Sequence, residues 1–261
     1  MKISLEGKHA LVGGSSKGIG RAVAEQLAGS GARVTLIARS EALLQDLVKK
    51  LNDKSGKSHS YLVLDYTDLP SYQPAIQAYL KENPADILVN NTQGPPAGTS
   101  LEKNLKDYQE AFDLLFKSVV FTTLEALPHM QNQGWGRIIN IASVSVREPL
   151  GYLALSNSIR AALVSWAKTL AGDVGPDGVT VNSVLTGYFN TERLKGLNDK
   201  KAETMGISPE EVTGRLISQV PVRRLGKPEE YGYLVAFLAS RQAAYLTGTA
   251  IPLDGGLLRS Y

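Results

Sequence analysis

Short aliphatic and β-branched runs alternate along the chain with longer stretches whose apolar residues recur at helical spacing. Continuous apolar runs are typical of parallel strands covered on both faces, and the alternation is typical of β-α-β units. The predicted strands are HALVGG (9–14), RVTLIA (33–38), SYLVLD (60–65), DILVNN (86–91), GRIINIAS (136–143), VTVNSVL (179–185) and TAIPLD (249–254). Helices are predicted to start near Gly18, Glu41, Ser71, Leu101, Gly151 and Pro228. Right-handed crossovers then build an α/β fold, a doubly wound, seven-stranded parallel sheet with helices on both faces.

One segment is more polar and charged than its surroundings. It is TERLKGLNDKKAETMGISPEEVTGRLISQV (191–220), between the last two predicted strands. A polar insertion at the ligand end of such a sheet is a candidate substrate lid, and a solvated helical excursion is the alternative. The chain has no internal repeat and no linker, which predicts a single domain over residues 1–261.

Composition and charge exclude several classes. The chain has 261 residues, 43% hydrophobic and 20% charged, enough apolar material for one large core. Without cysteine and with only three separated histidines, it offers neither a thiol nucleophile nor metal-ligand spacing. A net charge of +3 is too small to favour nucleic acid as a partner. No segment has the apolar length of a membrane span or the pattern of a signal peptide, so a cytoplasmic protein is expected.

A glycine-rich turn lies between the first predicted strand and the first predicted helix. Glycines let the backbone approach a pyrophosphate, and the N–H groups at a helix N-terminus attract its negative charge. This strand-to-helix context makes GGSSKGIG (13–20) a Rossmann-like dinucleotide-binding turn. Its candidate cofactor-binding residues are Gly14, Ser16, Lys17, Gly18, Ile19 and Gly20.

The end of the second predicted strand distinguishes between nicotinamide cofactors. An acidic residue there accepts hydrogen bonds from a ribose 2′-hydroxyl and repels a 2′-phosphate. The chain has Arg39 at this point and no carboxylate until Glu41, and Lys17 adds a second cation. Two cations without an acid favour NADP(H) over NAD(H).

At this point the sequence resembles the short-chain dehydrogenase/reductase family, and within it the 3-oxoacyl-acyl-carrier-protein reductases. The resemblance covers nearly the whole chain. It is carried by GGSSKGIG, LDYTD (64–68), ILVNN (87–91), ALPHM (126–130), GRIINIASVS (136–145), RAALVSWAKTLA (160–171), VTVNSVLTG (179–187), RLGKPEE (224–230) and LTGTAIPLDGG (246–256). It implies that Asp65 contacts the adenine, that Asn91 lines the adenosine side, and that Gly187 and Thr191 lie near the nicotinamide. It also implies a homotetramer.

The resemblance fails at most of the positions that carry the family's chemistry. The family uses a tyrosine as acid/base, a lysine four residues later, a serine after the fifth strand and an asparagine on the preceding helix. These positions correspond here to Ser156, Arg160, Ser143 and Leu115, so only Ser143 matches. Smaller departures are Gly13 for a common threonine, and Thr92 and Gln93 for alanine and glycine.

The replacements differ in their chemical consequences. A serine hydroxyl has a pKa far above the phenolic value of about 10, so Ser156 is a poor acid or base. Arg160 keeps a positive charge and can hold a ribose hydroxyl, but it does not deprotonate. Tyr152, four residues before Ser156, and Tyr188, after the sixth strand, are candidates for a displaced acid; ordinary pocket-wall tyrosines are the alternative. Arg147 could meet an anionic substrate.

Three hypotheses follow for the function. The first is an NADP(H)-dependent oxidoreductase acting on a small carbonyl or hydroxyl substrate, of which a 3-oxoacyl compound is one option, with Ser143 as polarising donor. The second is a catalytically impaired NADP(H)-binding sensor or assembly protein. A third, a homologue without cofactor, is disfavoured by the glycine turn and Arg39. Apolar residues beyond one stripe on the helices near 101–130 and 151–172 predict subunit contacts, in a homotetramer or a dimer.

Overall fold

A computed structural model of the chain describes residues 3–260. Within this range, seven parallel strands form one sheet in the order β3-β2-β1-β4-β5-β6-β7. The strands are β1 (His9–Val12), β2 (Arg33–Ala38), β3 (Ser60–Val63), β4 (Ile87–Asn90), β5 (Gly136–Ile141), β6 (Val179–Thr186) and β7 (Ala250–Leu253). The strand order reverses between β1 and β4, which confirms the predicted doubly wound α/β fold.

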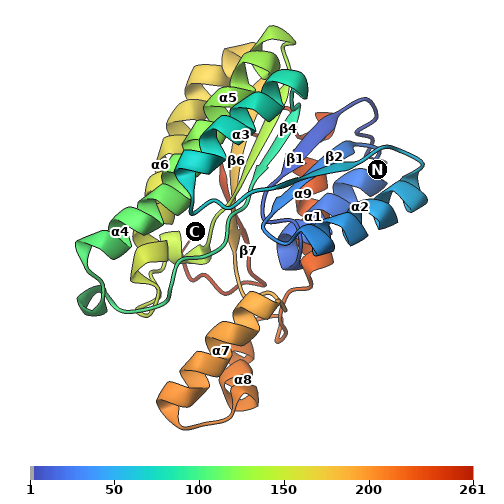
Figure 1. Cartoon of the computed structure of the whole chain (residues 1–261). Helices are drawn as coiled ribbons and strands as arrows, with labels where there is room; N and C mark the ends of the chain where they lie inside the picture. Colours follow the sequence, from blue (N-terminus) through green and yellow to red (C-terminus); the bar gives the residue numbers. More distant parts are fainter. Residues whose placement is uncertain (1–2, 261) are drawn as a thin grey trace.

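Helices cover both faces of the sheet. They are α1 (Gly18–Gly29), α2 (Glu41–Ser55), α3 (Leu69–Glu82), α4 (Leu105–Phe112), α5 (Ser118–Asn132), α6 (Ala154–Val174), α7 (Glu192–Met205), α8 (Pro209–Gln219) and α9 (Pro228–Leu238). Short 3-10 helices span Ser100–Glu102, Val144–Val146, Gly175–Asp177 and Arg241–Ala243. Helices α1, α2 and α9 lie on one face and α3, α5 and α6 on the other (Figure 1). No helix in residues 3–260 is long and apolar enough to cross a membrane.

The core consists of two apolar layers separated by the sheet. Successive residues of a strand point to opposite faces, so Val12 packs with α1, α2 and α9, whereas Leu11 packs with α3, α5 and α6. Leu36 and Ile37 divide between the layers in the same way. Both faces of the central strands are therefore buried, which is why their sequences are continuously apolar.

Two predicted helix starts are wrong. The segment at Leu101 is a 3-10 turn with Leu101 fully exposed, and α4 begins only at Leu105, where the Asn104 side chain caps it. The helix expected near Gly151 begins at Ala154. Backbone bonds between Gly98 and the segment 152–154 form a bridge that keeps Tyr152 out of the helix.

The long apolar helix predicted after residue 101 is interrupted. A π-helical segment, Asp113–Lys117, lies between α4 and α5. Such π-helical insertions are rare overall, but those that occur are often found at functional sites. This one carries Leu115, the position at which the resemblance expects an asparagine.

The polar segment 191–220 folds as two helices, α7 and α8, that stand apart from the layers (Figure 1). Ala202, Val212 and Leu216 are buried in this pair, and Asn198 Nδ2 donates to Thr213 Oγ1 at 2.9 Å. The segment is attached at the carboxyl end of β6, the side of the sheet where ligands of such folds bind.

Candidate active site

A cavity of about 920 Å³ lies at the carboxyl ends of the strands. Its size is near the upper end of the roughly 300–1,000 Å³ typical of small-molecule pockets. Among the residues that line it are Gly14, Ser16, Lys17, Gly18, Ile19, Gly20, Arg39, Asn91, Ser143, Tyr152, Ser156, Arg160, Gly187, Tyr188 and Thr191. The fold thus brings the sequence-predicted site residues together at one place, with Asp65 outside the lining.

The glycine turn is shaped for close approach of a ligand. Gly14 and Gly18 have φ of +53° and +54°, a left-handed conformation that side chains disfavour. A Cβ on Gly20 would lie 2.7 Å from the Asn91 side-chain nitrogen. Helix α1 has neither a side-chain cap nor an acidic residue in its first turn. Its first N–H groups therefore face the cavity without a charged protein partner, as an anion-binding turn requires.

Asn91 holds this turn in place. Its Nδ2 atom donates to the carbonyl oxygens of Gly13, at 3.0 Å, and Gly14, at 3.3 Å. These bonds tie the end of β4 to the end of β1, across the point where the strand order reverses. Asn91 thus shapes the turn as well as lining the cavity.

The unusual Gly13 is explained by a residue that the sequence analysis missed. A Cβ at Gly13 would lie 2.5 Å from the Tyr66 hydroxyl and 2.5 Å from the Asn91 carbonyl oxygen. Tyr66 lines the cavity, packs against Tyr72 with a centroid separation of 4.8 Å, and has a pKa raised by burial. Glycine at position 13 makes room for this tyrosine, so the two residues form a matched pair.

Arg39 stands directly after β2 and faces the carboxylate of Asp65, two residues after β3. Its Nη1 atom lies 3.7 Å from Asp65 Oδ2. Burial opposes ionisation of Asp65, but the hydrogen bonds from Thr67 and the nearby Arg39 together lower the pKa of the Asp65 carboxyl. Asp65 is therefore ionised and orients Arg39 toward its own side of the cavity. Its contact with an adenine stays a prediction.

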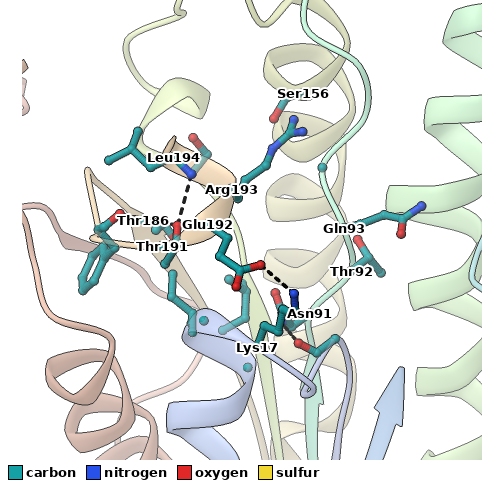
Figure 2. A pocket seen from close by; sticks show the side chains of 18 of the residues that line it. Lys17, Asn91, Thr92, Gln93, Ser156, Thr186, Thr191, Glu192, Arg193 and Leu194 are labelled. Atoms are coloured by element: carbon teal, nitrogen blue, oxygen red, sulfur yellow. Dashed lines mark hydrogen bonds and ion pairs between the residues drawn. The ribbon is translucent and has the colours of Figure 1, made fainter. Parts of the chain in front are cut away.

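Lys17, the second predicted phosphate ligand, forms an ion pair with the start of α7. Its Nζ atom pairs with Glu192 Oε2 at 2.8 Å, and both side chains are more than half exposed (Figure 2). This ion pair joins the glycine turn to the first turn of α7. The charge of Lys17 is consequently shared with a carboxylate that the sequence analysis did not single out.

The α6 side of the cavity carries Ser156 and Arg160, the positions at which the resemblance expects a tyrosine and a lysine. Ser156 is buried, and Arg160, one turn later, donates from Nη1 to the carbonyl oxygen of Ile141 at the end of β5. Burial lowers the pKa of Arg160 to about 10, so the guanidinium stays protonated at neutral pH. No carboxylate of residues 3–260 lies within salt-bridge distance of it.

Ser143 lies beside these residues, after β5. Its Oγ atom caps the 3-10 turn by accepting a hydrogen bond from the Ser145 N–H at 3.1 Å. A serine hydroxyl that accepts one bond still has its proton to donate. Ser143 can therefore polarise an oxygen atom placed in the cavity.

Leu115 occupies the position at which the resemblance expects the asparagine of a proton relay. It is 1% exposed and packs in an apolar cluster with Ala111, Leu114, Leu155 and Ile159. Leu155 is the immediate neighbour of Ser156, so the apolar cluster reaches the α6 position that lacks its tyrosine. The π-helical segment is present, but its side chain at this position cannot carry a proton.

The candidate displaced acids, Tyr152 and Tyr188, both line the cavity. Burial raises the pKa of Tyr152 to about 12, with a further contribution from nearby Tyr188. Burial also raises the pKa of Tyr188. These shifts favour the neutral phenol, whereas a tyrosine acid/base near neutrality needs a lowered pKa. Arg147 lies outside the lining, and its Nη2 donates to Ala250 O at 3.0 Å.

The first turn of α7 extends across the cavity. Thr191 caps this helix by accepting from the Leu194 N–H at 3.2 Å. Arg193 reaches to the loop after β4, where Nη2 donates to Pro95 O at 2.8 Å and lies against Gly94. Figure 2 shows its guanidinium directed toward the α6 turn that carries Ser156, with Thr92 and Gln93 on the loop beyond.

Arg193 and Glu192 were missed by the sequence analysis. Their signal was a charged pair directly after Thr191, at the start of the predicted lid. Charged residues there are expected for any solvated helix. Their convergence on the cavity depends on where α7 lies in the fold.

A strand-order reversal with a glycine turn after β1 is the arrangement of a dinucleotide-binding fold. The chain belongs to the short-chain dehydrogenase/reductase family. The sequence profile of the family described as enoyl-(acyl carrier protein) reductase matches residues 14–258.

Individual relatives span the whole chain. The 3-oxoacyl-[acyl-carrier-protein] reductase FabG of Vibrio cholerae serotype O1 is 35% identical over 258 residues, covering 98% of this chain and 99% of the relative. L-sorbose reductase from Gluconobacter frateurii, solved with NADPH and L-sorbose, has a TM-score of 0.93 at 30% identity and full coverage of both chains. A 3-oxoacyl (acyl-carrier-protein) reductase from Agrobacterium tumefaciens C58 with NADP bound has a TM-score of 0.87 at 29% identity, covering 97% of this chain and 95% of its own. The family resemblance is therefore confirmed.

Proposed function

We propose that this protein is an NADP(H)-dependent oxidoreductase acting on a carbonyl or hydroxyl group of a small molecule. The observation that carries the proposal is the cavity end formed by the uncapped glycine turn and Arg39, with no carboxylate directly after β2. A 2′-phosphate is the anion that such an arginine recognises. Both solved structures described above contain NADPH or NADP, which supports the same choice.

The residues around the cavity fit this cofactor. The glycine turn, from Gly14 to Gly20, offers backbone N–H groups for the pyrophosphate, and Arg39 offers a cation for the 2′-phosphate. Arg160 has donors for a ribose hydroxyl, while Gly187 and Thr191 line the end assigned to the nicotinamide. When bound, NADPH supplies a hydride to an electrophilic carbon.

The chain's own residues then have two tasks. Ser143 donates a hydrogen bond to the substrate oxygen and so favours negative charge on it. The proton that this oxygen receives comes from a displaced tyrosine, Tyr152 or Tyr188, or from water. Ser156 is too weak an acid for this role, and Leu115 removes the usual relay. Proton delivery is thus the step in which this chain differs most from its family.

Fluorescence titration with NADPH and NADH tests the cofactor assignment. The wild type should prefer NADPH, and Arg39→Asp should weaken NADPH binding at least about tenfold without weakening NADH. Arg33→Asp, at the opposite end of β2, is the matched control and should leave both affinities unchanged. A wild type that binds neither nucleotide would contradict the site.

Turnover assays over ketones and 3-oxoacyl thioesters then test the reaction. Thioesters come first because several relatives are named as 3-oxoacyl reductases. Hydride transfer to any member of the panel supports the oxidoreductase. Tight NADPH binding with no turnover on any of them would instead support the sensor or assembly protein.

We further propose a homotetramer, with a dimer as the alternative. Leu105 on α4 and Leu124 on α5 are 89% and 53% exposed in the single chain, and burying them against another subunit would be favourable. Light scattering should show a stable oligomer, and a monomer would contradict this proposal. A cytosolic location stays a prediction.

A further inference from the structure

The cavity contains more positive than negative charge. Its charged lining residues are Lys17, Arg39, Arg160, Arg193 and the single carboxylate Glu192. Lys17 is paired with Glu192, and Arg39 faces Asp65. Arg160 and Arg193 are the cations that no carboxylate among the described residues neutralises.

These two arginines come from different elements that line the same cavity. Arg160 projects from α6 and donates to Ile141 O, whereas Arg193 projects from α7 and donates to Pro95 O. Arg193 points toward the α6 turn of Ser156, one turn before Arg160 (Figure 2). Burial lowers the pKa of Arg160, and the charge of Arg193 lowers it further, as expected for neighbouring cations.

Such a pair is unfavourable unless an anion joins it. Each guanidinium has five N–H donors, and a single carbonyl oxygen satisfies only one or two of them. The half-buried Arg160 and the more exposed Arg193 carry like charges that repel each other, and backbone carbonyls only partly compensate. A carboxylate placed between the guanidiniums would supply the missing charge and accept several of the remaining donors.

We propose that Arg193, together with the Arg160 donors that the cofactor ribose leaves free, binds a carboxylate of the substrate, so that the substrates of this protein are oxo acids or hydroxy acids. The inference rests on the proposed function, because it assigns the occupant of the same cavity. The position of Ser156 supports it, since a serine leaves space where the family has a tyrosine. Arg160 contacts the Ile141 carbonyl, two residues before Ser143, so an acid anchored there lies near the hydroxyl that polarises the oxygen to be reduced.

The alternative occupant is a phosphate of the cofactor. The phosphate-binding features, namely the glycine turn and Arg39, come from α1 and the end of β2, whereas Arg160 and Arg193 come from α6 and α7. The two cationic groups thus belong to different walls of the cavity. A substrate carboxylate is the better match for the second group.

Calorimetric titration with malonate, an unreactive dicarboxylate, tests the proposal. The titration is made on the protein with and without NADP⁺. Malonate should bind the wild type, and its neutral diamide should not. Arg193→Met should weaken malonate binding at least about tenfold, since a charged hydrogen bond is lost, and Arg193→Lys should recover part of it. Lys195→Met, which removes an exposed cation from the same helix, should have no effect.

The outcomes separate this inference from the cofactor assignment. NADPH affinity of Arg193→Met should equal that of the wild type, because Arg193 is assigned to the substrate. Equal malonate binding by Arg193→Met and wild type, or equal binding of malonate and its diamide, would overturn the inference. So would an absence of malonate binding, or competition between malonate and NADPH that Arg39→Asp abolishes. A wild type that binds malonate but not NADPH would instead overturn only the proposed function.

With NADPH, turnover gives a second readout. Aliphatic 2-oxo acids should be reduced with a kcat/KM at least about tenfold above that of their carboxamides, and Arg193→Met should remove this difference mainly through KM. Turnover of neutral ketones or thioesters that exceeds turnover of the acids would overturn the substrate class while leaving the oxidoreductase intact.

Discussion

The two ends of the cavity differ in how far they keep the family pattern. The glycine-turn end, with Gly14, Gly20 and Asn91, keeps the features that bind a dinucleotide. The α6–α7 end has a serine and an arginine where the resemblance expects a tyrosine and a lysine, and a second arginine enters from α7. Binding of a cofactor and proton chemistry are thus supplied by separate parts of the fold.

This separation has a physical basis. Cofactor binding depends on backbone geometry at the ends of β1 and β2, where close contacts leave little room for larger side chains. The chemistry depends on side chains of α6, α7 and the π-helical segment, which can be exchanged without disturbing the sheet. A chain can therefore keep its cofactor frame while its reacting end takes a different substrate.

The largest effect is expected at the glycine-turn end. Gly20→Ala would bring a Cβ within 2.7 Å of Asn91 Nδ2 and against the Gly14 carbonyl, whereas Gly29→Ala, in the same helix, meets nothing within 4 Å. We expect Gly20→Ala to weaken NADPH binding about 100-fold, as distortion of a preorganised phosphate turn costs several kcal/mol. Gly29→Ala should bind like the wild type, and equal affinities of the two variants would break the comparison.

The next effect concerns the apolar reacting end. Leu115→Asn restores the family's asparagine, but it buries an amide among Ala111, Leu155 and Ile159. We expect urea denaturation to show a loss of about 2–3 kcal/mol in the free energy of unfolding. Leu115→Met, which keeps the position apolar, should lose less than about 1.5 kcal/mol. If Leu115→Asn has the same free energy of unfolding as the wild type, polar groups at this end of the cavity must hydrogen-bond the introduced amide.

Ionisation of Tyr152 sharpens the comparison further. Its pKa is raised from 10 to about 12 in the folded state. The resulting stabilisation is full below pH 10 and is lost as the pH rises toward 12, because the unfolded chain ionises first. We expect urea denaturation to show that the free energy of unfolding of the wild type falls by about 1–2 kcal/mol between pH 10 and 12, relative to that of Tyr152→Phe. The partial exposure of the ring is taken into account in this value.

The same variants test the proton source. If Tyr152 stays neutral, pH profiles of turnover should show no ionisation near neutrality that Tyr152→Phe removes, and Tyr188→Phe serves as the parallel variant. A group titrating near pH 7 that disappears in either variant would identify a tuned acid and would bring the α6–α7 end back to the family's chemistry.

The smallest effect should come from the ion pair that joins the two ends. Glu192→Gln frees Lys17 from its 2.8 Å contact, but both side chains are well exposed and screened. We expect NADPH affinity to rise by no more than about threefold, with the gain fading at high salt. Lys195→Gln, nearby on α7, is the control. A large change would show that closure of α7 limits cofactor binding.

The fold class and the cofactor end could be predicted because their signals are local. Alternation of apolar runs determines which segments are strands, and a glycine turn between a strand and a helix has few conformations. The departures at the positions where the resemblance expects a tyrosine and a lysine were also visible, because Arg160 opens the motif RAALVSWAKTLA and Ser156 stands four residues before it.

Only the tertiary structure decided the rest. The match between Gly13 and Tyr66, the apolar surroundings of Leu115 and the contact of Arg193 with Pro95, 98 residues away, join segments that are distant in the chain. Local periodicity carries no information on such contacts, since they depend on how helices pack on the sheet. The start of α6 at Ala154 has the same origin, because the bridge between Gly98 and Leu153 keeps the preceding residues out of the helix. Sequence alone thus determined the sheet and its glycine turn, and packing between distant segments determined which charges meet in the cavity.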